Sequence, residues 1–314
     1  MPTEPLAYLR GQLLPVSQAH IAIFDAAVVL GATVTDFTRT FHQQPFRLED
    51  HAERFYRSAT YARIKPPIPL EETLRLSREI ITHNAALLRP DQELGMVYFM
   101  SPGEFTVYAG SAGGQSFMMP TFCIHTFPLH FNLWRHYYTE GVHAVVPPTR
   151  HVPPQCVSPK AKNRSRLHWW IADQESHEVD PKAVSLLLDL DGNITETGGS
   201  NFIMVRRGTV ISPQPRHILW GISLETVREL CGDLGIPFQT EDLQIYDVAN
   251  ADEAMLASTP YCLAPVTRIN GLTIGQGTTD GPIFSRLIAA WGERVGVDLL
   301  QQIMTYEPPA EAMT

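Results

Sequence analysis

The sequence predicts an α+β protein of about two domains. The chain has 314 residues, 44% of them hydrophobic, which is enough to bury more than one core. Short runs rich in β-favouring residues alternate with segments whose apolar residues recur at helical spacing. In addition, Asp191-Gly192 lies between two apolar runs, a strong local signal for a β-hairpin.

Residues 1–128 predict a small α+β domain. Strands are expected, from β-propensity and turn signals, over 7–14, 19–24, 28–41, 95–100 and 116–127. Helices are expected over 47–62 and 70–88, separated by the proline-rich break at 66–69. Asp50 is a candidate N-cap of the first helix, which carries Arg54.

Residues 129–140 are aromatic and carry two histidines, and we interpret them as the connection to a large domain over 141–314. Trp169 and Trp170 give the segment that follows the lysines the bulk of a buried helix, and we expect both in the core. The other elements expected here are strands over 142–147 and 251–260, the hairpin over 186–205, and helices over 224–234 and 283–295.

The composition excludes several classes of function. A net charge of −9 argues against a broad surface for nucleic acid or anionic membranes. The start of the chain lacks a signal pattern and no apolar run reaches the length of a membrane span, so we expect a cytoplasmic protein. The four cysteines form no CxxC pair, which favours reduced core thiols and no metal site; they are Cys123, Cys156, Cys231 and Cys262.

Glu196 is the residue around which the hairpin is organised. It follows the return strand at Ile194-Thr195 and precedes the bend at 197–200, where Gly198 and Gly199 accept positive φ at little cost. A carboxylate in this position is either a solvated turn residue or a placed partner for a cation. Base rates alone favour the solvated alternative.

Two further features contain groups that could take part in chemistry. Lys160 and Lys162 lie at the mouth of a packed segment, where a lysine can lose its proton and act as an amine nucleophile. Ser223, a candidate N-cap of the 224–234 helix, marks a helix start whose N–H groups could bind an anion such as phosphate. With Arg54 and Glu196, these groups match the needs of pyridoxal phosphate: an amine, a phosphate site and a carboxylate for the pyridine nitrogen.

The sequence resembles the class IV aminotransferases, the fold-type IV pyridoxal phosphate enzymes, from Phe24 to about Val297. This group contains branched-chain and D-amino acid aminotransferases, (R)-selective amine transaminases and aminodeoxychorismate lyase. The resemblance implies a smaller α/β domain, a larger pseudo-barrel domain and a homodimer. It rests on motifs that occur in the family's order, at 46–54, Lys162 ahead of 174–175, 191–202, 219–223, 251–253, 258–259 and 265–266.

The resemblance also implies roles for individual residues. Lys162, rather than Lys160, would form the Schiff base with pyridoxal phosphate and move the proton at the substrate α-carbon. Glu196 would pair with the pyridine nitrogen. The phosphate would be held by Arg54, Ile222 through its backbone, Ser223 and Thr259. The reaction would be a ping-pong transfer of an amino group from a donor amine or amino acid to a 2-oxo acid.

Departures from the subfamily patterns bear on the substrate. Branched-chain enzymes usually carry Tyr soon after the lysine, where this chain has 164–167, and Pro260 has no N–H for a substrate carboxylate. D-amino acid enzymes usually carry an Arg and a His after the strand at 95–100, and this chain has neither. The residues that we predict to contact substrate are Thr35, Arg39, Tyr98, Arg164 and Arg166, each of the arginines with a structural role as the alternative.

The run at 152–163 and Asp36 are most similar to the (R)-amine transaminases. We therefore expect an (R)-amine or D-amino acid donor, with L-branched-chain donors close behind. The alternative is 4-amino-4-deoxychorismate lyase, because Lys162 to Leu167 resembles the Lys-x-x-x-Arg-Leu pattern of that enzyme. A scaffold that only binds the cofactor is a third, less favoured interpretation, since the catalytic lysine and its supporting residues are all present.

Overall fold

The structure is a computed structural model that describes residues 4–110, 117 and 119–309, and it divides into two compact units. The first unit comprises Met1–Leu129 with Ala161–Arg166, and the second comprises His130–Lys160 with Leu167–Thr314. From the sequence we expect Lys162 in the large domain over 141–314. In the structure its segment groups with the first unit, because the segment's backbone is hydrogen-bonded to that unit.

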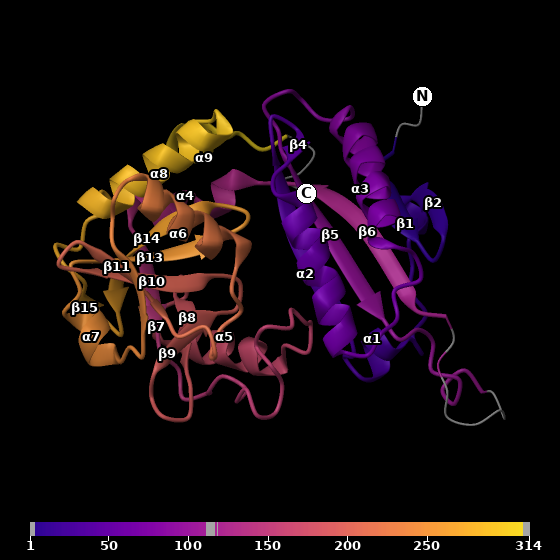
Figure 1. Ribbon diagram of the computed structural model, residues 1–314, viewed down its shortest axis with the longest axis horizontal. Helices are drawn as coiled ribbons and strands as arrows, with labels where there is room; N and C mark the ends of the chain where they lie inside the picture. Colours follow the sequence, from indigo (N-terminus) through magenta and orange to yellow (C-terminus); the bar gives the residue numbers. More distant parts are fainter. Residues whose placement is uncertain (1–3, 111–116, 118, 310–314) are drawn as a thin grey trace. The chain divides into compact units, whose positions relative to one another are not determined.

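The first unit is built on a six-stranded antiparallel sheet, drawn in indigo to magenta in Figure 1, with the strand order β2-β1-β6-β5-β3-β4. Its strands are β1 (Leu6–Leu9), β2 (Gln12–Pro15), β3 (Val34–Phe41), β4 (Gln44–Pro45), β5 (Leu94–Ser101) and β6 (Thr121–Pro128). Its helices are a 3-10 turn (Val16–Gln18), α1 (Ala26–Val29), α2 (Leu48–Tyr61) and α3 (Leu70–Ala85).

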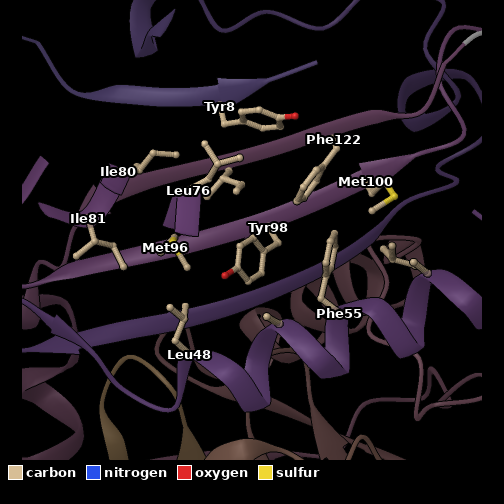
Figure 2. Close-up of a cluster of buried hydrophobic side chains, with 14 of the residues drawn as sticks. Tyr8, Leu48, Phe55, Leu76, Ile80, Ile81, Met96, Tyr98, Met100 and Phe122 are labelled. Atoms are coloured by element: carbon tan, nitrogen blue, oxygen red, sulfur yellow. The ribbon is translucent and has the colours of Figure 1, made fainter. Parts of the chain in front are cut away.

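The core of this unit lies between the sheet and helices α2 and α3 (Figure 2). Alternate residues of each strand point to this side, as the period of two requires. Phe55 of α2 packs against Tyr98 and Phe122, with ring centroids 5.3 and 5.5 Å apart. Burial of such large apolar side chains is the main stabilising term for the unit.

Several predicted boundaries in the first unit are wrong. Residues 28–41 do not form one strand, because Asp25 accepts a hydrogen bond from Ala27 N at 2.8 Å and starts α1. The strand expected at 19–24 does not form, and the run at 7–14 is a hairpin of two strands. Arg47 rather than Asp50 occupies the N-cap position of α2. The start of the strand expected at 116–127 falls on Ser116, which lies outside the described residues.

The second unit contains a closed ring of strands. Its sheet has the order β12-β11-β10-β13-β14-β7-β8-β9, with β15 paired to β14, and β9 also pairs with β10. The strands from β10 through β13, β14, β7, β8 and β9 therefore close into the predicted pseudo-barrel. They are β7 (Val142–Val145), β8 (Val184–Leu188), β9 (Ile194–Thr197), β10 (Asn201–Arg206), β11 (Thr209–Pro213), β12 (Phe238–Glu241), β13 (Glu253–Ser258), β14 (Cys262–Ile269) and β15 (Leu272–Thr273).

The helices of the second unit correct two predictions. Gly221, not Ser223, is the N-cap of α6 (Ile222–Asp233), so Ser223 lies inside the first turn. Trp169 is buried as predicted, but Trp170 is 63% exposed, because only one side of α5 (Leu167–Val179) packs on the barrel. The other helices are a 3-10 turn (Phe131–Trp134), α4 (Arg135–Thr139), α7 (Ile245–Ala249), α8 (Pro282–Val295) and α9 (Leu299–Thr305).

Within the described ranges, no helix combines the length and apolar character needed to cross a membrane. No group of three or more His, Cys, Asp or Glu side chains in the same ranges is placed to hold a metal ion. Cys123, Cys231 and Cys262 are free buried thiols, as predicted for core cysteines, whereas Cys156 is exposed.

Candidate active site

Glu196 lies on the return strand of the predicted hairpin, which the second unit contains as β8 and β9. The turn between the strands is locked by Asp189, whose Oδ1 accepts hydrogen bonds from the N–H groups of Asp191 and Asn193 at 2.9 and 2.8 Å. Gly192 has φ +85°, a conformation that favours glycine. The local Asp-Gly signal therefore determines where the return strand places the carboxylate.

The Glu196 carboxylate is a placed group and not a solvated turn residue. Its Oε1 accepts a hydrogen bond from Leu219 N at 3.0 Å, and its Oε2 accepts one from Asn201 Nδ2 at 3.1 Å. His151 Nε2 lies 3.6 Å from Oε1. Only 12% of the side chain is exposed, so these partners replace most of its water. This arrangement holds a negative charge at a set position.

Asn201 links that carboxylate to the start of α6. Its side-chain amide donates to Leu219 O at 2.7 Å and its Oδ1 accepts from Gly221 N at 3.2 Å. A Cβ at Gly221 would lie 2.2 Å from the same Oδ1, so a larger residue there would displace the Asn201 amide from this bridge. The bridge sets the loop that leads into Ile222 and Ser223.

The first turn of α6 is where the sequence predicts an anion site. N–H groups at the start of a helix have no acceptor within the helix, and the helix dipole favours negative charge there. Ile222 and Ser223 are the first two residues of α6. Thr259 directly follows β13, and Ala257 of that strand pairs with Asn201, so Thr259 comes from the same end of the sheet. These three predicted phosphate contacts therefore belong to one region of the second unit.

Lys162 is anchored to the first unit through its backbone. Its carbonyl accepts a hydrogen bond from Thr35 N at 3.0 Å, and its N–H donates to Ser58 Oγ at 3.1 Å. Asn163 forms an isolated antiparallel bridge with Val34, so the segment runs beside the start of β3. Lys162 is half-buried. The side-chain amine therefore extends from a backbone held at two points.

Arg54 lies in a buried ionic cluster of the first unit. Its Nε and one Nη donate to the two oxygens of Asp36, each at 2.9 Å, and His51 Nδ1 lies 2.8 Å from Asp36 Oδ1. Burial by itself would raise the pKa of Asp36, but the charge of Arg54 and the bonds from His51 and Arg54 hold that pKa well below its usual range. Asp36 thereby sets the direction of the Arg54 guanidinium.

The pKa of His51, in the same cluster, lies below its usual value. Burial lowers its pKa, the bond and charge of Asp36 oppose that shift, and the charges of Arg54 and Lys162 lower the pKa further. Lys162 is thus close enough to this cluster for its charge to affect the pKa of His51. The two predicted cofactor residues of the first unit, Lys162 and Arg54, therefore both act electrostatically on His51.

Three of the predicted substrate residues have surroundings that fit a structural role. Tyr98 is 1% exposed, lies in the core of Figure 2 and shares a 2.7 Å hydrogen bond with Ser77, so a substrate role does not fit. Arg39 is 2% exposed, with its guanidinium 4.0 Å from the centre of the Phe41 ring, which fits packing. Thr35 donates to Tyr98 O and holds Lys162, so its hydroxyl has a structural partner.

Arg164 and Arg166 lie on the lysine segment and are exposed. The charge of Arg164 lowers the pKa of two side chains of β6, Cys123 and His125. Burial raises the pKa of the Cys123 thiol to about 12, and Arg164 opposes that rise. Burial lowers the pKa of His125, and Arg164 lowers it further. Arg164 therefore directs its charge over the face of the sheet that carries Cys123 and His125.

A family model described as amino-transferase class IV matches residues 33–269. The chain belongs to the class IV aminotransferases. That span includes every predicted cofactor residue, from Arg54 to Thr259. Members of this family are pyridoxal phosphate enzymes, and the closed strand ring of the second unit is the fold-type IV architecture that the sequence predicted.

Individual relatives of this class IV aminotransferase are distant. Branched-chain-amino-acid aminotransferase-like protein 1 of Arabidopsis thaliana is 27% identical over 97% of this chain, which spans only 53% of that relative. D-alanine aminotransferase of Staphylococcus aureus is 25% identical, over 89% of this chain and 94% of the relative. The crystal structure of a branched-chain aminotransferase from Thermoproteus uzoniensis with norvaline has a TM-score of 0.80 and 25% identity, over 93% of this chain and 95% of that one.

Two residues at the site were not assigned a role from sequence. Asn201 stands in the motif that follows Glu196, and an amide after a glycine bend at a strand start was the available signal. His151 carried no signal, because its contact with Glu196 joins segments far apart in the chain.

Proposed function

We propose that this protein is a pyridoxal phosphate-dependent aminotransferase that moves an amino group from an amine or amino acid to a 2-oxo acid. The observation that carries the proposal is the Glu196 carboxylate, held by Leu219 N–H and Asn201 and tied through Asn201 to the amide-lined start of α6. A pyridine nitrogen and a phosphate on one ring need such a pair of sites.

The donor set of the chain fits this cofactor. In the second unit, Glu196 would hold the pyridine proton, and the N–H of Ile222 with the hydroxyls of Ser223 and Thr259 would hold the phosphate. In the first unit, Arg54 would contribute charge to the phosphate, since Asp36 fixes the direction of its guanidinium. When bound, pyridoxal phosphate supplies an electron sink for negative charge at the substrate α-carbon.

Lys162 would carry the proton transfers. Its amine would take the proton from the α-carbon of the donor in the first half-reaction and return one to the α-carbon of the acceptor in the second. The two backbone anchors at Thr35 and Ser58 limit how far that amine can move. General acid–base catalysis depends on such positioning.

Replacing Glu196 with glutamine should slow amino transfer. The amide oxygen of the new side chain could still accept from Leu219 N, but the side chain would carry no charge for the pyridine proton. Losing a charge-assisted hydrogen bond of about 1.5–3 kcal/mol corresponds to about 10- to 150-fold in the half-reaction rate. Single-turnover kinetics would measure it, with Glu178→Gln as the matched control, because Glu178 is exposed on α5. A Glu196→Gln rate within twofold of wild type would contradict the assigned role.

We further propose an (R)-amine or D-amino acid donor and a pyruvate-like acceptor, with L-branched-chain amino acids as the next candidates. Pro260 supports this, since it offers no N–H beside Thr259 to an L-amino acid carboxylate. Arg164 and Arg166 remain our proposed carboxylate contacts, because both are exposed on the lysine segment. The similarity to both D-alanine and branched-chain relatives is consistent with either donor class.

The donor preference can be measured by mixing the cofactor-loaded protein separately with D-alanine, (R)-1-phenylethylamine and L-leucine. We expect the visible absorbance of the loaded protein to convert to that of the aminated cofactor rapidly with the first two. Conversion with L-leucine alone would show a branched-chain enzyme with another carboxylate contact. Release of pyruvate from aminodeoxychorismate without any 2-oxo acid would instead identify a lyase.

We also propose that the protein forms a homodimer, as the resemblance implies. The apolar side of α5 that does not pack on the barrel supports this, with Leu167, Trp170 and Ile171 exposed by 71, 63 and 42%. Apolar groups gathered on one helix face are typical of a protein interface.

A further inference from the structure

His151 is a buried side chain beside Glu196 that the proposed reaction does not yet use. It lies in the loop after β7, and its backbone N–H donates to Leu188 O at 2.9 Å, which ties the loop to the end of β8. The residue is 8% exposed. The rings of Trp169 and His168 pack against it, with centroids 5.5 and 5.8 Å away. The imidazole is therefore held in one orientation.

The hydrogen bonds of the ring determine which nitrogen carries a proton. Nδ1 lies 2.9 Å from Val152 O, and because a carbonyl can only accept, Nδ1 must be the donor. In a neutral imidazole Nε2 would then present a lone pair to Glu196 Oε1 at 3.6 Å, an unfavourable contact. A proton on Nε2 converts the same contact into an ion pair.

We propose that His151 is a positioning residue for Glu196: as an imidazolium it pairs with the carboxylate, so that the proton shared with the cofactor resides on the pyridine nitrogen. The inference rests on the proposed function for the cofactor part alone. The pairing of His151 with Glu196 is a property of the polypeptide. The state of His151 would thus regulate how strongly Glu196 attracts the proton.

The charges around His151 support this. Burial lowers its pKa, but the contact and charge of Glu196, the bond to Val152 O and the charge of Asp189 outweigh it, and the pKa is raised above its ordinary value. The other titratable groups that face it are His168 on α5 and, beyond Asp189, His217, whose Nε2 lies 3.7 Å from Asp189 Oδ2. Of these neighbours, the carboxylates of Glu196 and Asp189 favour the protonated form of His151.

The pairing can be tested without catalysis. Histidine NMR titration of the full-length chain, with and without pyridoxal phosphate, would give the pKa of His151, its signal identified by loss in His151→Asn. We expect a value above 6.5 that falls by about one pH unit in Glu196→Gln and stays unchanged in Glu178→Gln. A His151 pKa that Glu196→Gln leaves unchanged would overturn the proposal, whether or not the protein is an aminotransferase.

The effect on the cofactor can be tested by absorbance against pH in the loaded protein. Wild type should show a step where His151 titrates. His151→Asn, which lacks the charge, should lose the step, and His151→Lys, which keeps a cation, should hold the low-pH spectrum of wild type through the range where His151 titrates. A purely structural histidine would leave the wild-type step in both variants, and that result would refute the regulation of Glu196.

Discussion

Replacing Lys162 with alanine is expected to reduce aminotransferase turnover by at least about 10³-fold, because the variant lacks both the amine that bonds the cofactor and the group that moves the proton. The backbone anchors at Thr35 and Ser58 do not involve the side chain, so the fold should be retained. The measurement is the steady-state rate with the preferred donor and pyruvate.

Lys160 provides the matched control for this experiment. It lies two residues before Lys162, is exposed, and belongs to the other unit. Lys160→Ala should keep activity within about twofold of wild type, as surface substitutions usually do. If Lys160→Ala abolished turnover while Lys162→Ala retained it, the catalytic lysine would be misassigned.

Replacing Asp36 with alanine is expected to lower the free energy of unfolding by about 3–5 kcal/mol, since Arg54 and His51 would keep their burial and lose their shared partner. Arg54 and His51 are 6% and 1% exposed. Urea denaturation would measure the loss. Asp91→Ala is the control, because its pair with Arg89 is largely exposed and should contribute at most about 1 kcal/mol. Equal losses in the two variants would contradict the role of the buried cluster.

The same cluster predicts the direction of the pH dependence. The folded-state pKa of Asp36 lies below its unfolded value, so its stabilisation is complete above the unfolded pKa and is lost as pH falls through the folded pKa. The pKa of His51 is also lowered, so the unfolded chain binds a proton first as pH falls below about 6.5. Both groups make wild type less stable toward acid. Asp36→Ala should lose the part of that slope below about pH 4.

Much of the fold in both units was predictable because the signals for its hairpins and helices are local. Asp191-Gly192 specified the hairpin and placed Glu196 at the end of the return strand, as the turn bonds of Asp189 confirm. The helices α2, α3 and α8 follow apolar spacing and lie within a few residues of the predicted ranges. Ordered motifs also identified the family, which the match over residues 33–269 confirms.

The tertiary structure decided what depends on contacts between distant segments. Closure of the strand ring by β9 and β10, the anchoring of Lys162 beside Thr35, and the contact between His151 and Glu196 each join residues that no local pattern connects. The burial of Tyr98 and exposure of Trp170 follow from which face of an element meets the core. The sequence by itself determined the chemical groups and the turns that carry them. Only the packing of the chain decided which groups meet, because hydrogen bonding and burial depend on position in space.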